Sequence, residues 1–258
     1  MTERTFFSQS AGPVVLGLGL PMGSVTVQVL DSITTARVEL RTADPSGPAA
    51  DAVSRARGSQ DGQAFAVEVP EIPSHVITQS FRGNRVTQSM HTVYGSVTGI
   101  TIVNGRIING GSADTMTTVS PIEARVILPV GSSLAVVSQS ADTVVHGDLD
   151  RMEFRSVSGG MRADGVRSLT ASTTSGDILT GRVAERITAR SVSGSLAVNV
   201  YSGCAAELDT TSGNVSVRAT SAAYGAVRAN SVSGDVDISA GSHLRVSAHS
   251  VSGRVCTR

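Results

Sequence analysis

The segment ANSVSGDVDISAG, residues 229–241, contains a six-residue pattern that returns throughout the C-terminal part of the chain. Each copy has a serine or threonine, a valine or threonine, a serine and a glycine, followed by one variable and one apolar residue. A catalytic site is normally built once, so this repetition indicates architecture before chemistry. The copies are SVSGGM from Ser156, TTSGDI from Thr173, SVSGSL from Ser191, TTSGNV from Thr210, SVSGDV from Ser231 and SVSGRV from Ser250.

The copies follow one another at a nearly constant distance. Successive glycines of the pattern are separated by 17, 18, 19, 21 and 19 residues, and a degenerate copy, SQSAD, places Ala141 at the glycine position 18 residues before Gly159. A steady period near twenty residues predicts stacked supersecondary units. The glycines are Gly159, Gly176, Gly194, Gly213, Gly234 and Gly253.

Around each glycine, apolar and polar residues alternate with a period of two. The residues seven and five positions before it are apolar, the residues next to these are polar, and the residue two positions after it is apolar again. This predicts two short strands per unit, with side chains pointing alternately inward and outward. Units this short cannot bury a face alone, so each strand should pair in parallel with its equivalent in the next unit. The sequence therefore predicts a parallel β-solenoid (β-helix) with rungs of about 18–20 residues and glycine at one corner.

The first half of the chain predicts a β-rich region, residues 1–123, ahead of solenoid repeats over residues 124–258. Alternating valines predict a strand over 25–29. One short helix is expected near 48–57, because Pro48 suits a first helical turn and apolar residues follow at helical spacing. Residues 72–120 predict short β segments with turns at VNGR and NGGS. The fold class is therefore all-β.

The repeat motif, written S/T-x-S-G-D/N-V, resembles the bacterial DUF4097 family, a group described as putative adhesins with β-strand repeats. The segments GPVVLGLGLPMGSVTVQV, residues 12–29, and LPVGSSL, residues 128–134, are similar to the same family. The likeness covers most of the chain. It implies a β-helical fold.

Composition argues against several classes of protein. The 21 basic and 21 acidic residues cancel, which removes the electrostatic footprint of a nucleic-acid-binding protein. No stretch reaches the roughly 18 apolar residues that a membrane span requires. The N-terminal MTER has no net positive charge and no cleavage-site pattern follows it, so we expect a cytoplasmic protein. Two cysteines are too few for a disulfide framework.

The hydroxyl residues of the motif raise the question of which side chains face outward. Simple alternation predicts that both hydroxyl residues of each copy point inward as ladders, satisfied from rung to rung, and that the residue between them points outward. A corner that bends earlier would exchange the two orientations, and both remain open. With the first orientation, six outward residues form an interaction stripe: Val157, Thr174, Val192, Thr211, Val232 and Val251.

The repeats do not predict a catalytic or metal site. A calcium array would not place Gly160 and Arg254 at the position that follows the motif glycine. The closest acidic group, Asp148, Asp150 and Glu153, has arginines beside it and predicts a charge-balanced edge. The histidines show no metal-ligand spacing. We therefore expect no catalytic residue, no metal and no cofactor.

Two further features predict partners. The repeats continue to the last residues, where either Arg254 and Arg258 blunt the open edge or a second copy covers it through Val251 and Val255. Two aromatic residues near the second corner would stack on a sugar, namely Tyr201 and Tyr224. The leading hypothesis is a non-enzymatic scaffold that binds a protein partner or itself. The alternative is a carbohydrate-binding or carbohydrate-active β-helix.

Overall fold

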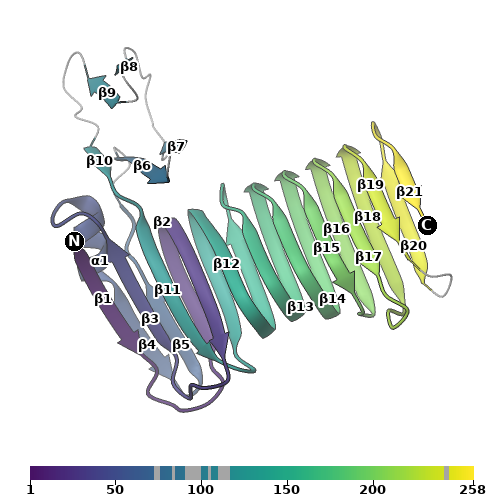
Figure 1. Ribbon diagram of the computed structural model, residues 1–258, viewed down its shortest axis with the longest axis horizontal. Coiled ribbons are helices and arrows are strands. Elements are labelled where there is room, and N and C mark those ends of the chain that lie inside the picture. The colour runs from purple at the N-terminus through teal and green to yellow at the C-terminus, as the bar shows by residue number, and fades with distance from the viewer. Residues whose placement is uncertain (73–75, 83–84, 91–99, 104–105, 110–116, 241–243) are drawn as a thin grey trace.

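The computed structural model describes residues 1–72, 76–82, 85–90, 100–103, 106–109, 117–240 and 244–258. Within these residues the chain is all-β with one helix. The strands of the 16-stranded main sheet lie side by side along the long axis of the molecule, and the two termini lie at opposite ends (Figure 1). This confirms the all-β expectation.

The N-terminal end contains a short helix among strands. Pro48 occupies the first turn of the helix, and Ala49, Ala52 and Val53 are buried, as the helical spacing of apolar residues predicts. The elements are β1 (Thr2–Phe7), β2 (Val15–Leu30), β3 (Arg37–Thr42), α1 (Pro48–Arg55), β4 (Arg57–Asp61) and β5 (Ala64–Glu68).

The main sheet is mixed rather than purely parallel. β1 pairs with β3 and β3 with β11 (Ile122–Pro129) in antiparallel fashion, whereas β11 and β5 both run parallel to β2. β2 in turn runs parallel to β12 (Ser133–Ser156), so the N-terminal strands and the repeats share one sheet. The repeat region is therefore part of a larger sheet whose N-terminal edge is antiparallel.

From β12 onward every pairing is parallel, and the strands divide into two ladders. Met161 lies opposite Ile178, and Ile178 opposite Leu196, in one ladder. Ile187 lies opposite Ala206, and Ala206 opposite Val227, in the other. β14 pairs with both ladders, so it joins them. The strands are β13 (Met161–Ser175), β14 (Ile178–Ser193), β15 (Leu196–Tyr201), β16 (Ala205–Ser212), β17 (Val215–Ala219), β18 (Ala226–Ser233), β19 (Val236–Ser239), β20 (Arg245–Ser250) and β21 (Val255–Thr257).

The core lies between the two ladders and continues into the N-terminal strands. Its buried side chains form one cluster from Val14 to Leu244, built mainly of valine, leucine, isoleucine and alanine. The period-two alternation is visible in the structure, since Ile187 and Ala189 are buried while Arg186 and Arg190 beside them are exposed.

The region between β5 and β11 contains the short β segments expected there. β6 (Val76–Arg82) pairs with β7 (Arg85–Met90) in antiparallel fashion and with β10 (Thr117–Val119) in parallel. β8 (Ile100–Val103) pairs with β9 (Arg106–Asn109). The centres of the turns predicted at VNGR and NGGS lie outside the described residues. Among the residues that are described, no helix has the length and apolar character needed to cross a bilayer.

Candidate interaction surface

The glycines of the motif allow successive repeats to approach closely. A Cβ atom on Gly194 would lie 1.9 Å from the carbonyl oxygen of Gly176, and one on Gly213 would lie 2.1 Å from that of Gly194. Neither glycine has a positive φ. The motif therefore requires glycine at this corner for the space between stacked repeats, and not for a left-handed turn.

The first hydroxyl residue of each motif binds the repeat before it. The Thr210 hydroxyl donates a 3.0 Å hydrogen bond to the carbonyl oxygen of Gly194, and the Ser231 hydroxyl donates a 2.9 Å bond to that of Gly213. Three further first hydroxyls do the same. The expectation that both hydroxyl residues point inward is therefore wrong for the second serine, which is exposed in every copy. The partner is usually a backbone carbonyl rather than another hydroxyl, because the side-chain-free glycine brings that carbonyl within reach.

The residue after the glycine is also used to join repeats. The Asp177 side chain accepts a 2.7 Å hydrogen bond from the backbone N–H of Ser195, and Asn214 accepts one of 2.8 Å from Asp235. Asp235 accepts a bond from the N–H of Arg254 in the same way. These contacts account for aspartate and asparagine at this position by hydrogen bonding to the next repeat.

The hydroxyl ladder makes a prediction for stability. Thr210→Val keeps the shape of the side chain but removes the hydrogen bond to Gly194, so it should lower the free energy of unfolding by about 1 kcal/mol, or about 2–4 °C in melting temperature. The neighbouring Thr211→Val replaces an exposed side chain and should leave the melting temperature nearly unchanged. Equal melting temperatures for the two variants would show that the ladder does not stabilise the stack.

The structure places the residues between the hydroxyls on the outside, as a single row that we call the Val/Thr stripe. Its four valines are 49–69% exposed, and both threonines are exposed as well. The backbone N–H of Thr174 donates to the carbonyl of Val157 at 3.2 Å, which stacks members of the row directly upon one another. At about 4.8 Å per strand, six members extend over about 24 Å. The stripe comprises Val157, Thr174, Val192, Thr211, Val232 and Val251.

The sheet faces beside the stripe carry balanced charges. The acidic residues Asp148, Asp150 and Glu153, which are close together in the sequence, do not form one cluster, because each pairs with a different arginine. Asp148 pairs with Arg182, whose nearest nitrogen is 2.6 Å away, and Glu153 pairs with Arg155 at 2.7 Å. Asp150 pairs with Arg167. The stripe itself contains no ionisable side chain, so a partner would cover it without removing a charge from water.

The two tyrosines proposed for sugar stacking have different environments. Tyr201 is fully buried, and burial raises the pKa of its hydroxyl. Its ring is therefore not available to a sugar, and that assignment is wrong. The sequence did not predict this burial because Tyr201 lies at a corner, where the alternation of apolar and polar residues no longer indicates which side chains face inward. Tyr224 is 63% exposed, so the pair does not form a stacking platform.

At the C-terminal end, β20 and β21 are edge strands. In the described part of the chain, β20 pairs only with β18 and β21 only with β19. Val251 and Val255 are exposed there, as are the side chains of Arg254 and Arg258. The structure thus brings the four residues predicted for the open end to one terminus of the stack, where apolar and cationic side chains adjoin each other.

Comparisons with known proteins agree with this architecture. The family model described as Toastrack DUF4097 matches residues 87–256. A crystal structure of a "putative adhesin" from Bacteroides fragilis has 10% identity and a TM-score of 0.51, with 100% of this chain and 97% of that chain covered. A "putative adhesin" from Parabacteroides merdae has 8% identity and a TM-score of 0.46, with 100% and 96% covered. No curated protein matches the sequence. At such identities the first likeness shows a shared fold.

Proposed function

Because the chain belongs to the Toastrack DUF4097 family, we propose that it is a non-enzymatic scaffold whose repeats form a rigid parallel β-solenoid. In this proposal the rungs contain about 18–20 residues, and residues 1–123 form a region that precedes the repeats over 124–258. The parallel partners Met161, Ile178, Leu196 and their successors support the proposal, because they follow one another with the same spacing as the motif glycines.

The observation that carries the function is the Val/Thr stripe. Exposed β-branched residues in an uninterrupted row offer apolar area that a partner can bury. The backbone beneath them is held by hydrogen bonds between repeats, such as that of Ser175 with Val157 at 2.8 Å. β-branched side chains have few rotamers, so little conformational entropy is lost on binding. A rigid apolar row is therefore suited to contact with another protein.

The partner that the surface fits best is a second copy of this chain. The edge strands β20 and β21 offer backbone groups that can pair with another strand, and Val251 and Val255 adjoin them. A two-fold contact would bring the same apolar side chains of two copies together. Association through this end would also continue the Val/Thr stripe from one copy into the next.

Light scattering on the full chain tests this proposal. We expect a dimer or larger assembly, and we expect the variant Val251→Asp/Val255→Asp to be a monomer, because charge at the edge opposes pairing. Val137→Asp places the same charge on an exposed valine outside both the stripe and the C-terminal end, and serves as the matched control, which should keep the mass of the native assembly. Val192→Asp tests the middle of the stripe separately. A monomeric native chain would contradict association through the end. If Val192→Asp were a monomer while Val251→Asp/Val255→Asp remained assembled, the contact between copies would lie on the stripe instead of at the end.

A further inference from the structure

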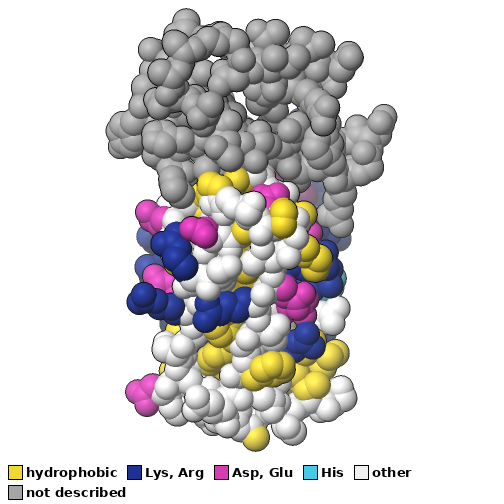
Figure 2. Space-filling model, turned by 90° about the vertical axis from the view of Figure 1, so that its left-hand side faces the viewer, with side chains coloured by type: hydrophobic (Ala, Val, Ile, Leu, Met, Phe, Trp, Pro, Cys, Tyr) yellow, Lys and Arg dark blue, Asp and Glu magenta, His cyan; other side chains and the backbone are white. Residues whose placement is uncertain are grey.

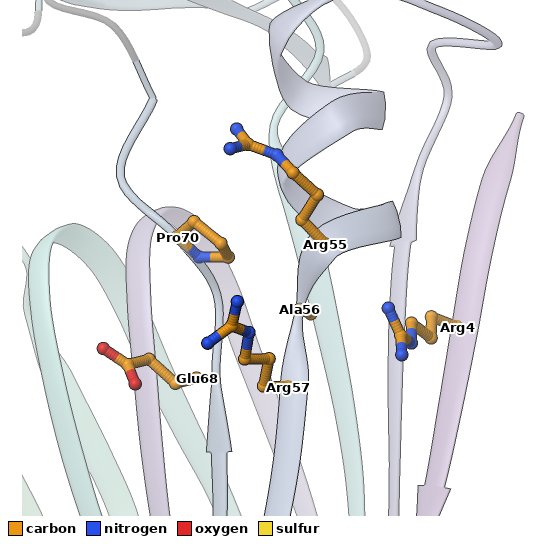
Figure 3. A pocket seen from close by; sticks show the side chains of 6 residues that line it. All are labelled: Arg4, Arg55, Ala56, Arg57, Glu68 and Pro70. Atoms are coloured by element: carbon orange, nitrogen blue, oxygen red, sulfur yellow. The ribbon is translucent and has the colours of Figure 1, made fainter.

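The opposite end of the molecule contains a pocket of about 530 Å³ whose lining is rich in arginine. The lining combines Arg4 of β1, Arg55 of α1 and Arg57 of β4 with three other residues, Ala56, Glu68 and Pro70. Arg55 and Arg57 extend toward the side on which the Pro70 ring lies, and Arg4 approaches from β1 (Figure 3). Three cationic side chains from three different elements thus surround one space.

The positive charge of this pocket is not balanced by its surroundings. Within the described residues, none of the three arginines forms an ion pair, although arginines elsewhere pair with Glu39, Asp148 or Glu153. Glu68 lies opposite Arg57 across the β4–β5 pair, but its carboxylate points away from the Arg57 guanidinium (Figure 3). The lining therefore has three positive charges and one negative charge. Like charges around one space repel each other unless an anion lies among them.

One of the arginines is held in place before any ligand arrives. The Arg4 guanidinium donates to the carbonyl of Ser54 in the last turn of α1 and lies 5.2 Å from the centre of the Phe6 ring. Phe6 in turn packs over Gly58, where a Cβ atom would lie only 2.6 Å from the ring. Gly58 thus makes room for the ring that supports Arg4. A pre-positioned guanidinium loses little side-chain entropy when it binds.

Apart from Glu68, the rest of the pocket wall is apolar and fixed. Ala56 is fully buried, and its N–H donates to the carbonyl of Val53, which fixes the chain between α1 and β4. Pro70 adds a rigid ring. Carbon atoms beside the arginines reduce the local dielectric and strengthen their attraction for an anion. The face that carries β1 and α1 shows several arginine side chains at its surface, with acidic side chains among them (Figure 2).

We propose that this pocket binds an oxyanion of the phosphate-ester class. Guanidinium groups match phosphate oxygens with paired, charge-assisted hydrogen bonds, and a cluster of arginines favours a doubly charged phosphate over a single carboxylate. Arg55 and Arg57 supply the charge that the ligand neutralises, and Arg4 adds a third guanidinium, which Ser54 holds in place. The ligand is either a small phosphorylated molecule or the headgroup of a phospholipid, since both present the same group.

Isothermal titration calorimetry with inorganic phosphate tests the site on the full chain. We expect saturable binding that weakens with added sodium chloride. The variant Arg55→Gln/Arg57→Gln should bind at least about tenfold more weakly, since it removes two charge-assisted donors. Arg218→Gln, an exposed arginine of β17 outside the pocket, is the matched control and should bind as the native chain does. Absence of native binding, or equal binding by the double variant, would overturn the proposal.

A second measurement identifies the source of the phosphate group. Co-sedimentation with phosphatidylcholine vesicles, with and without phosphatidic acid, reports binding to a lipid headgroup. Sedimentation that requires both phosphatidic acid and the two arginines indicates a lipid, whereas phosphate binding without sedimentation indicates a small molecule. Both exchanged arginines are exposed, so the double variant should melt at the native temperature. If the double variant melts at a lower temperature, phosphate binding is measured on the single variant Arg57→Gln instead. Equal phosphate binding by that variant and the native chain would overturn the proposed site.

Discussion

Replacing Ile187 with aspartate is expected to unfold several repeats together and to lower the free energy of unfolding by more than about 4 kcal/mol. Ile187 is 1% exposed and lies between Leu169 and Ala206 in one ladder of the core. A carboxylate there has no cationic partner, and burying an unpaired charge is among the most destabilising of substitutions. Each repeat is stabilised by its neighbours, so the damage extends beyond one unit.

The matched control is Thr188→Asp, one residue further along the same strand. Thr188 points outward between the exposed Arg186 and Arg190, and Glu207 lies opposite it on β16. An added carboxylate therefore stays in contact with water and has charges of both signs as neighbours. We expect a change within about 0.5 kcal/mol in chemical denaturation. Similar losses of stability for the two variants would show that the inward and outward faces of β14 are assigned incorrectly.

A methyl group added at Gly194 should have the second largest effect. In Gly194→Ala, the new Cβ would lie 1.9 Å from the carbonyl oxygen of Gly176 and 2.9 Å from the Ser191 hydroxyl oxygen. The backbones of two repeats must separate to relieve this contact, which weakens the hydrogen bonds between them. We expect a loss of about 3 kcal/mol, at the upper end of the range for overpacking, measured by denaturant unfolding.

Gly17→Ala provides the comparison, because Gly17 also lies within a strand but has room for a methyl group. Its Cβ would lie 3.9 Å from that of Ala66, which is an ordinary van der Waals contact. This variant should be neutral or slightly stabilising, since alanine loses less backbone entropy on folding than glycine does. If Gly194→Ala were equally well tolerated, close stacking would not be the reason for glycine in the motif.

The regular part of the fold follows from the sequence because the signal is repeated many times. Six copies with the same alternation predict which side chains are buried, and Ile187 and Leu208 are buried as expected. The family resemblance rests on the same motif, and the family match confirms it. The antiparallel edge formed by β1 and β3 could not be predicted in this way. Its pairing joins Thr2 to Thr42, and a single contact between distant segments leaves no periodic trace.

The candidate sites were harder to predict from the sequence, for different physical reasons. The orientation of the Val/Thr stripe depends on where the strand bends, and alternation alone allows two answers at a corner. The structure resolves this with Val192 outside and Ser191 inside. The arginine pocket was missed because Arg4 and Arg57 come from separate strands, and only the packing of α1 brings them to one space. An excess of arginine over acid at residues 55–57 was the only local signal.

The hydrogen bonds at the glycine corner have a consequence for how the chain can change in length. The carbonyls of the motif glycines from Gly159 to Gly234 are each fixed by the next repeat, so this corner cannot absorb an extra residue. The spacing nevertheless varies from 17 to 21 residues, and the longest step includes the segment between β17 and β18 around Tyr224. Insertions and deletions are therefore confined to one side of the molecule. That side has room for longer loops, while the opposite side keeps the regular spacing of the Val/Thr stripe.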